Sequence, residues 1–75
     1  MKVYLNEYGL KTYISTGLTK NNWITVKEKK NGSLQRICSI NLPIRYTPEE
    51  AQRDLDAFAA KRNWKVFEDK ENKND

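Results

Sequence analysis

Histidine is absent from this chain of 75 residues, which also contains only one cysteine. Without histidine, neither a Ser-His nor a Cys-His pair for nucleophilic catalysis can be assembled. Zinc sites made of Cys and His are excluded too, because one Cys supplies only one of the three or four ligands required. Cys38 cannot form an intramolecular disulfide, and its position in the apolar stretch Ile37–Ile40 predicts a small packing residue rather than a reactive thiol.

Phosphate loops and paired carboxylates are lacking as well. The three glycines stand alone at predicted turns, so there is no Gly-rich loop to cradle a phosphate. Glu49 and Glu50 are adjacent at a predicted helix start. Asp54 and Asp56 point to different sides of that helix, so a paired-carboxylate site is not expected. We therefore expect a non-enzymatic protein, without a cofactor or a metal, whose function is binding.

Long hydrophobic runs are also missing. No stretch approaches the roughly 18 apolar residues of a membrane span, and the first residues lack the apolar core of a signal peptide. Secreted domains of this size usually depend on several disulfides. The expectation is a cytoplasmic monomer without membrane contact. A chain of this length forms one domain, predicted over residues 1–67, and the charged segment 68–75 contains no apolar residue and is expected to be a disordered tail.

Positive charge, which the chain does contain, is unevenly distributed. The net charge is +4, but residues 1–48 carry eight cationic side chains and only two acidic ones. Residues 49–67 are balanced, and residues 68–75 carry four acids against two lysines. The positive charge therefore belongs to the first two-thirds of the chain, where the strands are expected.

Alternation of apolar and polar residues predicts the strands. Two short strands are expected over residues 2–6 and 10–16, separated by a turn. A clearer signal is the Asn31-Gly32 pair between residues 23–30 and 33–42, because this dipeptide favours the type I′ turn of a two-residue hairpin.

A two-residue loop determines which residues of this hairpin face each other. It would place Lys27 opposite Arg36 and Val26 opposite Ile37. Two like charges directly opposite disfavour pairing unless solvent or an anion lies against them. Apolar residues occur on both sides of the hairpin, so the pattern leaves open which of its faces is buried.

The second half of the chain predicts one helix. Thr47-Pro48-Glu49-Glu50 is a strong helix start, with Thr as N-cap, Pro in the first turn and a Glu placed for a capping box. The helix should span residues 48–62 and end at Asn63. Residues 64–67 should follow as a short strand or as an extended segment folded back on the core. The fold class is therefore α+β, a small antiparallel sheet of three to five strands packed on one helix. The apolar stripe that packs against the sheet is Ala51, Leu55, Phe58 and Ala59.

The basic hairpin is the candidate binding site. A two-stranded ribbon fits the major groove of DNA, and cationic and amide side chains hold phosphates or read base edges. Basic hairpin tips also keep sheet edges soluble, which is the simpler interpretation. A second functional interpretation is a small protein–protein interaction module, because Tyr and Trp are frequent at interfaces. The candidate residues for contact with double-stranded DNA are Lys27, Lys29, Lys30, Gln35 and Arg36.

The order of these elements carries a resemblance to a known family. A Trp-headed basic hairpin followed by Tyr46–Ala51 and a helix with Leu55 resembles the arm-type DNA-binding domain of tyrosine integrases from conjugative transposons and phages, over about residues 22–64. It is similar, too, to the plant AP2-type domain. The resemblance implies a three-stranded sheet that packs on one helix and enters the major groove. It also implies a DNA-binding accessory protein of a mobile genetic element, without a catalytic domain. The groove-facing residues that it implies are Lys27, Lys29, Gln35 and Arg36.

Overall fold

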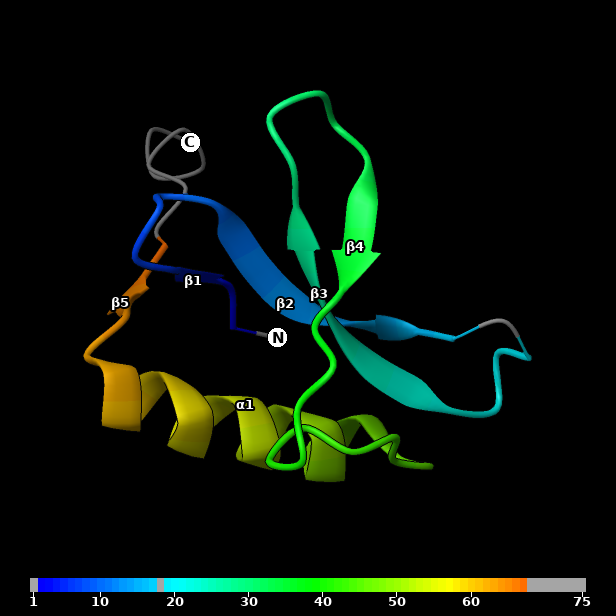
Figure 1. Cartoon of the computed structure of the whole chain (residues 1–75). Helices are drawn as coiled ribbons and strands as arrows, with labels where there is room; N and C mark the ends of the chain where they lie inside the picture. Colours follow the sequence, from blue (N-terminus) through cyan, green and yellow to red (C-terminus); the bar gives the residue numbers. More distant parts are fainter. Residues whose placement is uncertain (1, 18, 68–75) are drawn as a thin grey trace, which may run out of the picture.

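The computed structural model describes residues 2–17 and 19–67, which form an α+β fold of one helix and one antiparallel sheet (Figure 1). The strands lie side by side in the order β4-β3-β2-β1-β5, and the helix α1 runs across one face of them. This confirms the predicted fold class. The predicted tail, residues 68–75, lies outside the described residues. The elements are β1 (Tyr4–Leu5), β2 (Lys11–Thr16), β3 (Trp23–Glu28), β4 (Leu34–Arg36), α1 (Pro48–Arg62) and β5 (Lys65–Val66).

A tight turn organised by Asn6 joins β1 to β2. The side-chain Oδ1 of Asn6 accepts hydrogen bonds from the main-chain N–H groups of Tyr8 and Leu10, each at 2.9 Å. The N–H of Gly9 donates to the carbonyl of Asn6, and Gly9 takes a φ of +76°, which a glycine adopts without steric cost. The turn places Tyr4 directly opposite Thr12 in the sheet.

Both ends of α1 are capped by local signals, and its predicted bounds are confirmed. The hydroxyl of Thr47 accepts a hydrogen bond from the N–H of Glu50 (3.2 Å) and donates one to the carboxylate of Glu50 (3.1 Å). The capping box thus closes through the Thr47 hydroxyl. At the other end Asn63 adopts a left-handed conformation (φ 59°, ψ 35°), and its N–H meets the carbonyls of Ala59 and Ala60.

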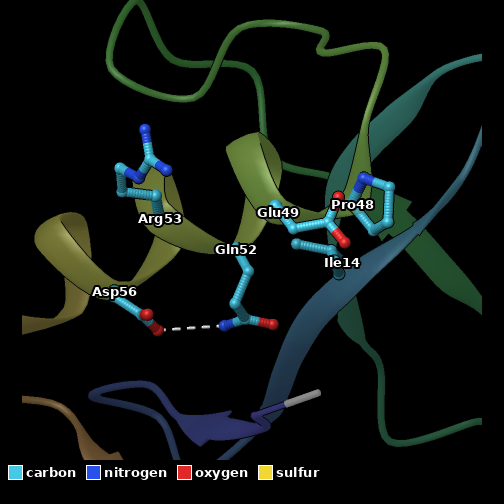
Figure 2. Close-up of a pocket in the computed structure, with 6 residues that line it drawn as sticks. All are labelled: Ile14, Pro48, Glu49, Gln52, Arg53 and Asp56. Carbon is cyan, nitrogen blue, oxygen red and sulfur yellow. Dashed lines mark hydrogen bonds between the residues drawn. The ribbon is translucent and has the colours of Figure 1, made fainter.

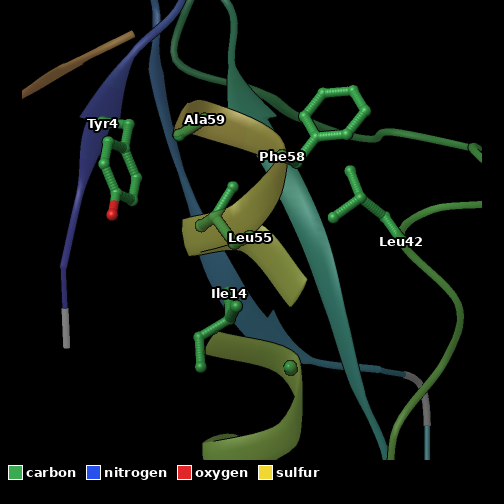
Figure 3. Close-up of a cluster of buried hydrophobic side chains, with 7 residues drawn as sticks. Tyr4, Ile14, Leu42, Leu55, Phe58 and Ala59 are labelled. Carbon is green, nitrogen blue, oxygen red and sulfur yellow. The ribbon is translucent and has the colours of Figure 1, made fainter. Parts of the chain in front are cut away.

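The core lies between α1 and the sheet (Figure 3). The predicted helix stripe is confirmed, with Leu55 fully buried at its centre. Phe58 stacks edge-on against Trp64, with ring centroids 5.4 Å apart. The residues that pack against the stripe from β1, β2 and the loop before α1 are Tyr4, Ile14 and Leu42.

The cross-strand register shows which sheet face is buried. Ile14 belongs to the core and pairs with Thr25, so these two side chains point toward α1. Tyr13 and its partner Val26 therefore point to the opposite face. Val26 is only 4% exposed, yet it lies outside the core cluster. The sequence left open which face of the hairpin is buried. In the structure, each of its two faces contains buried residues.

The register of the β3–β4 hairpin differs from the prediction by one residue. The expected Lys27–Arg36 and Val26–Ile37 pairs are wrong. Lys27 therefore does not face a like charge across the hairpin. The observed pairs are Val26–Arg36, Lys27–Gln35 and Glu28–Leu34.

The connecting loop explains this shift. The N–H of Lys29 donates to the carbonyl of Ser33 (2.8 Å), and the N–H of Gly32 donates to the carbonyl of Lys29 (2.9 Å). Within the loop only Gly32 has a positive φ (+91°), whereas a type I′ turn requires positive φ at Asn31 as well. The connection is therefore a three-residue loop with a left-handed glycine, the other common hairpin solution for this sequence.

Strand β4 is shorter than predicted, because the chain leaves the sheet after Arg36 to reach the core. Leu42 is 1% exposed and packs against α1, whereas Ile40 is 93% exposed. Burial of a Leu side chain stabilises the fold by roughly 1.5–3 kcal/mol. A strand that continued straight to residue 42 would lose this contribution. The main chain of Trp23 consequently pairs with Arg45, at 2.6 and 3.0 Å, and not with Ile40.

Cys38 occupies the point where the chain leaves the sheet. The N–H of Ile37 donates to the carbonyl of Thr25, and the half-buried Ile37 side chain packs against the core. The next residue, Cys38, is exposed. The predicted packing role of Cys38 is therefore wrong, because the one-residue shift in register placed its neighbour inward instead.

Candidate functional site

The sheet face opposite α1 is not covered by the helix, and we refer to it as the open face (Figure 1). Its members follow from the alternation of the strands, starting from Tyr13 and Val26. The residues that define it are Leu5, Lys11, Tyr13, Ser15, Ile24, Val26, Glu28, Leu34, Arg36 and Lys65.

The centre of the open face is a row of three cross-strand neighbours. Val26 pairs with Tyr13 on one side and with Arg36 on the other, which accounts for its burial. Arg36 itself is exposed, and within the described residues it takes part in neither of the two salt bridges, which join Arg45 to Asp54 and Arg62 to Glu7. The centre is therefore an apolar base with a free guanidinium beside it.

The one acidic side chain of the open face is engaged by a neighbour. The hydroxyl of Tyr13 donates a hydrogen bond to Glu28 Oε2 at 3.1 Å. Burial, followed by this hydrogen bond and the negative charge of Glu28, raises the pKa of Tyr13 above its ordinary value. Glu28 thus offsets part of the positive charge of the face while holding Tyr13 in place.

A second row crosses the open face at the β1–β5 side. Leu5 pairs with Lys11 and with Lys65, so one lysine lies on each side of Leu5 in the sheet. The Nζ of Lys11 lies 4.5 Å from the centroid of the Phe67 ring, a cation–π distance. This row was not included in the predicted site. The signal that could have revealed it is the alternation of β2, which separates Lys11 from the inward-facing Thr12.

The tip of the β3–β4 hairpin carries two further exposed cations. Lys29 and Lys30 lie at the loop, whose shape is maintained by Asn31. The Oδ1 of Asn31 accepts hydrogen bonds from the N–H and the hydroxyl of Ser33, at 3.0 and 2.7 Å. The tip is therefore a preformed cationic projection, which extends away from α1 in Figure 1.

The structure does not bring all five predicted DNA-contacting residues to one surface. Lys27 and Gln35 pair with each other and point to the helix side of the sheet. Lys27 lines a hollow of about 280 Å³ beside Arg62 at the end of α1. Arg36 is on the open face, and only the tip lysines project beyond both faces. The expectation that Lys27, Gln35 and Arg36 share a groove-facing surface is therefore corrected.

A larger hollow, of about 460 Å³, lies at the first half of α1 (Figure 2). Asp56 lines this hollow, and its carboxylate accepts hydrogen bonds from the Tyr4 hydroxyl (2.6 Å) and from Gln52 Nε2 (2.9 Å). Burial, the hydrogen bond to Asp56 and the negative charge of Asp56 raise the pKa of Tyr4 to about 12. Asp56 therefore acts as a structural acceptor that ties β1 to α1. The hollow is lined by Ile14, Pro48, Glu49, Gln52, Arg53 and Asp56.

Within residues 2–17 and 19–67, no three Cys, Asp or Glu side chains form a group that could bind a metal ion. Over the same residues, no helix has the length and apolar character needed to cross a membrane. No protein-family model, curated protein or solved structure matches the chain.

Proposed function

We propose that this protein binds double-stranded DNA through the open face and the β3–β4 hairpin tip. The observation that carries the proposal is the uncovered sheet face with Lys11, Arg36 and Lys65 on it, continued by the two lysines of the tip. Cations of this kind hold phosphates and account for most of the affinity in non-specific DNA binding. In this role the protein acts without catalysis, as an accessory DNA-binding protein of a mobile genetic element.

The architecture supports this proposal. Strands β2, β3 and β4 form a three-stranded antiparallel unit in which neighbours in sequence are neighbours in space, and α1 follows directly. The family that the sequence resembles is expected to insert such a sheet into the major groove by its uncovered face. Here that face is free of helix, and the hairpin tip projects away from α1, as a ribbon that enters a groove about 12 Å wide must do.

The distribution of charge supports the same orientation. The carboxylates of α1 lie on the other side of the sheet from Arg36 and Lys65. A duplex approaching the open face meets three cations and one acid, whereas one approaching α1 meets four acids and three cations. Long-range attraction therefore favours one orientation of the encounter. The acids of the first half of the helix are Glu49, Glu50, Asp54 and Asp56.

A set of single substitutions tests the proposed surface. Lys11→Gln, Arg36→Gln and Lys65→Gln should each weaken binding to a 20-base-pair duplex about three- to tenfold at low salt, because each removes one phosphate contact. Lys27→Gln is the matched control, since it removes the same charge from the helix side of the same sheet. It should weaken binding less than twofold.

The losses of duplex affinity in these variants, measured by fluorescence anisotropy, show whether the open face or the helix side of the sheet contacts DNA. If Lys27→Gln weakens binding more than Arg36→Gln, the helix side of the hairpin is the contact surface. If the protein does not bind duplex DNA at about 50 mM salt, the DNA proposal is wrong.

A contact with another protein is the second candidate function, and one observation favours it. Three large apolar side chains are exposed in the segment that joins β4 to α1, with Ile40 the most exposed of them. Isolated exposed apolar residues are common, but several in one segment indicate a contact site. Ile40→Ser should weaken binding of a protein partner and leave DNA affinity unchanged, so a loss of DNA affinity in this variant would assign the segment to the DNA contact instead. The three residues are Ile40, Ile44 and Tyr46.

A further inference from the structure

The outer edge of β4 has main-chain groups that the fold leaves available. The N–H of Lys29 donates a hydrogen bond to the carbonyl of Ser33, and the N–H of Ile37 donates one to the carbonyl of Thr25. These two hydrogen bonds show which residues of the strand direct their main-chain groups toward β3. In an antiparallel pair every second residue directs its N–H and C=O toward the partner strand. Since residues 33, 35 and 37 face β3, the N–H and C=O of Leu34 and Arg36 point away from the sheet.

No neighbouring segment covers these groups. β4 is the terminal strand of the sheet order, and all three of its residues are exposed. Outside the β3–β4 ladder, no hydrogen bond within residues 2–17 and 19–67 engages Leu34 or Arg36. The edge contains no proline and no bulge, which are two of the devices that protect edge strands. Its one protection is charge, from Arg36 and the adjoining tip lysines.

We propose that the outer edge of β4 is a docking site for an acidic, extended segment of another protein, which adds as a sixth strand. The charge of the edge selects this partner. Lys29 and Lys30 precede the strand, Arg36 is part of it, and Lys27 lies one strand inward. Self-pairing would bring the same cations of two copies together, whereas an acidic strand neutralises them.

The side chains of β4 also specify the pattern of the partner. Leu34 and Arg36 lie on the open face, so the two partner residues opposite them lie on that face too. An apolar residue suits the position beside Leu34, and Asp or Glu suits the position beside Arg36. Their spacing is two residues. The residue between them points to the helix side, near Gln35 and Lys27, where a second acid fits.

The docking site shares Arg36 and the tip lysines with the proposed DNA contact, but the two partners would occupy different positions. DNA would lie on the open face, whereas the added strand lies in the plane of the sheet beside β4. A substitution that removes only an outward N–H therefore affects one function and not the other.

The test uses the full chain and a synthetic eight-residue peptide with blocked ends, which carries Val at the position opposite Leu34 and Glu at the positions opposite Gln35 and Arg36. Binding is followed by two-dimensional NMR of the labelled protein. We expect saturable shifts of the Leu34 and Arg36 amides. Leu34→Pro removes one outward N–H without removing a β3–β4 hydrogen bond, and proline is tolerated at such edge positions. It should weaken binding roughly two- to tenfold relative to Leu34→Ala, the change expected from one hydrogen bond.

Peptide controls keep the test informative if Leu34→Pro disturbs the hairpin. The same peptide with N-methyl groups on its edge-facing nitrogens cannot pair, and it should cause no shifts at Leu34 and Arg36. A peptide with Lys in place of Glu should not bind either. The proposal is overturned if the acidic peptide shifts only open-face residues such as Tyr13, or if the N-methylated peptide binds equally well. It is also overturned if the edge amides shift with protein concentration alone, because a second copy would then be the occupant.

Discussion

Tyr4 links the first strand to the helix through one short hydrogen bond. Its ring lies in the core (Figure 3), and its hydroxyl donates to Asp56 Oδ1 at 2.6 Å. The same Oδ1 of Asp56 also accepts a hydrogen bond from Gln52 Nε2 of the same helix. Because β1 has only two residues, this contact and the packing of the Tyr4 ring secure an element that its backbone bonds alone would hold weakly.

The pH dependence of stability should report this contact. The pKa of Tyr4 rises from 10.0 to about 12 in the folded protein. A group whose pKa is raised by folding stabilises the protein fully below its unfolded pKa and loses that contribution as the pH passes its folded pKa. Stability should therefore fall from about pH 10 to about pH 12, and part of this fall should be absent in Tyr4→Phe.

Denaturant unfolding of the wild type and Tyr4→Phe at several pH values measures this difference. At neutral pH the variant should lose about 1–3 kcal/mol, the value of a hydrogen bond to a charged group. Between pH 8 and pH 11 the gap between the two proteins should narrow. A constant gap over this interval would contradict the assigned role of the Tyr4 hydroxyl.

Cys38 provides an independent check of where the chain leaves the sheet. Its side chain is exposed, and it lies just after β4. A thiol reagent should therefore modify Cys38 in the native protein as fast as in the unfolded protein, within about tenfold, because no opening of the fold is required. Strong protection that disappears in denaturant would indicate a longer β4 with Cys38 packed inside.

At the scale of elements, α1 supplies four of the seven buried residues of the core cluster. Replacement of Leu55 or Phe58 by Ala should cost roughly 2–5 kcal/mol, because each leaves a cavity in the only core of the described chain. For a domain of this size, that is a large part of the total stability. Lys61→Ala, an exposed position on the same helix, is the control and should change stability by less than about 0.5 kcal/mol. Thermal melts of the three variants measure the effect, and unchanged melting of both core variants would contradict the packing.

The helix could be predicted from sequence because its signals are local. Thr47 and Pro48 mark its start, Asn63 marks its end, and the apolar stripe identifies the buried side. The hairpin could be located but its register could not. Asn31-Gly32 is compatible with a two-residue and with a three-residue loop, and the choice changes every cross-strand pair by one residue.

The binding face could be predicted only in part, for the same reason. Arg36 and the tip lysines were identified from their positions in the hairpin. The register error placed Lys27 beside Arg36, although the sheet separates them. Lys65 could not be found from local sequence, because it joins the open face only through the pairing of β5 with β1, far apart in the chain.

At the scale of the whole molecule, the two sides of the sheet differ in charge. The open face carries three cations and one acid, whereas α1 on the other side of the sheet carries four acids and three cations. Such a difference orients a charged partner before contact and makes the rate of association depend on salt. It also predicts that a polyanion should shift the NMR signals of the open face more than those of α1.

The salt dependence of duplex binding tests the central claim most directly. With about three to five phosphate contacts, the logarithm of the affinity should fall with the logarithm of the salt concentration with a slope of roughly −3 to −5. The Lys11→Gln and Lys65→Gln variants should each reduce the magnitude of this slope by about one, and Lys27→Gln should leave it unchanged. A wild-type slope near zero, or a slope that only Lys27→Gln reduces, would contradict DNA binding through the open face.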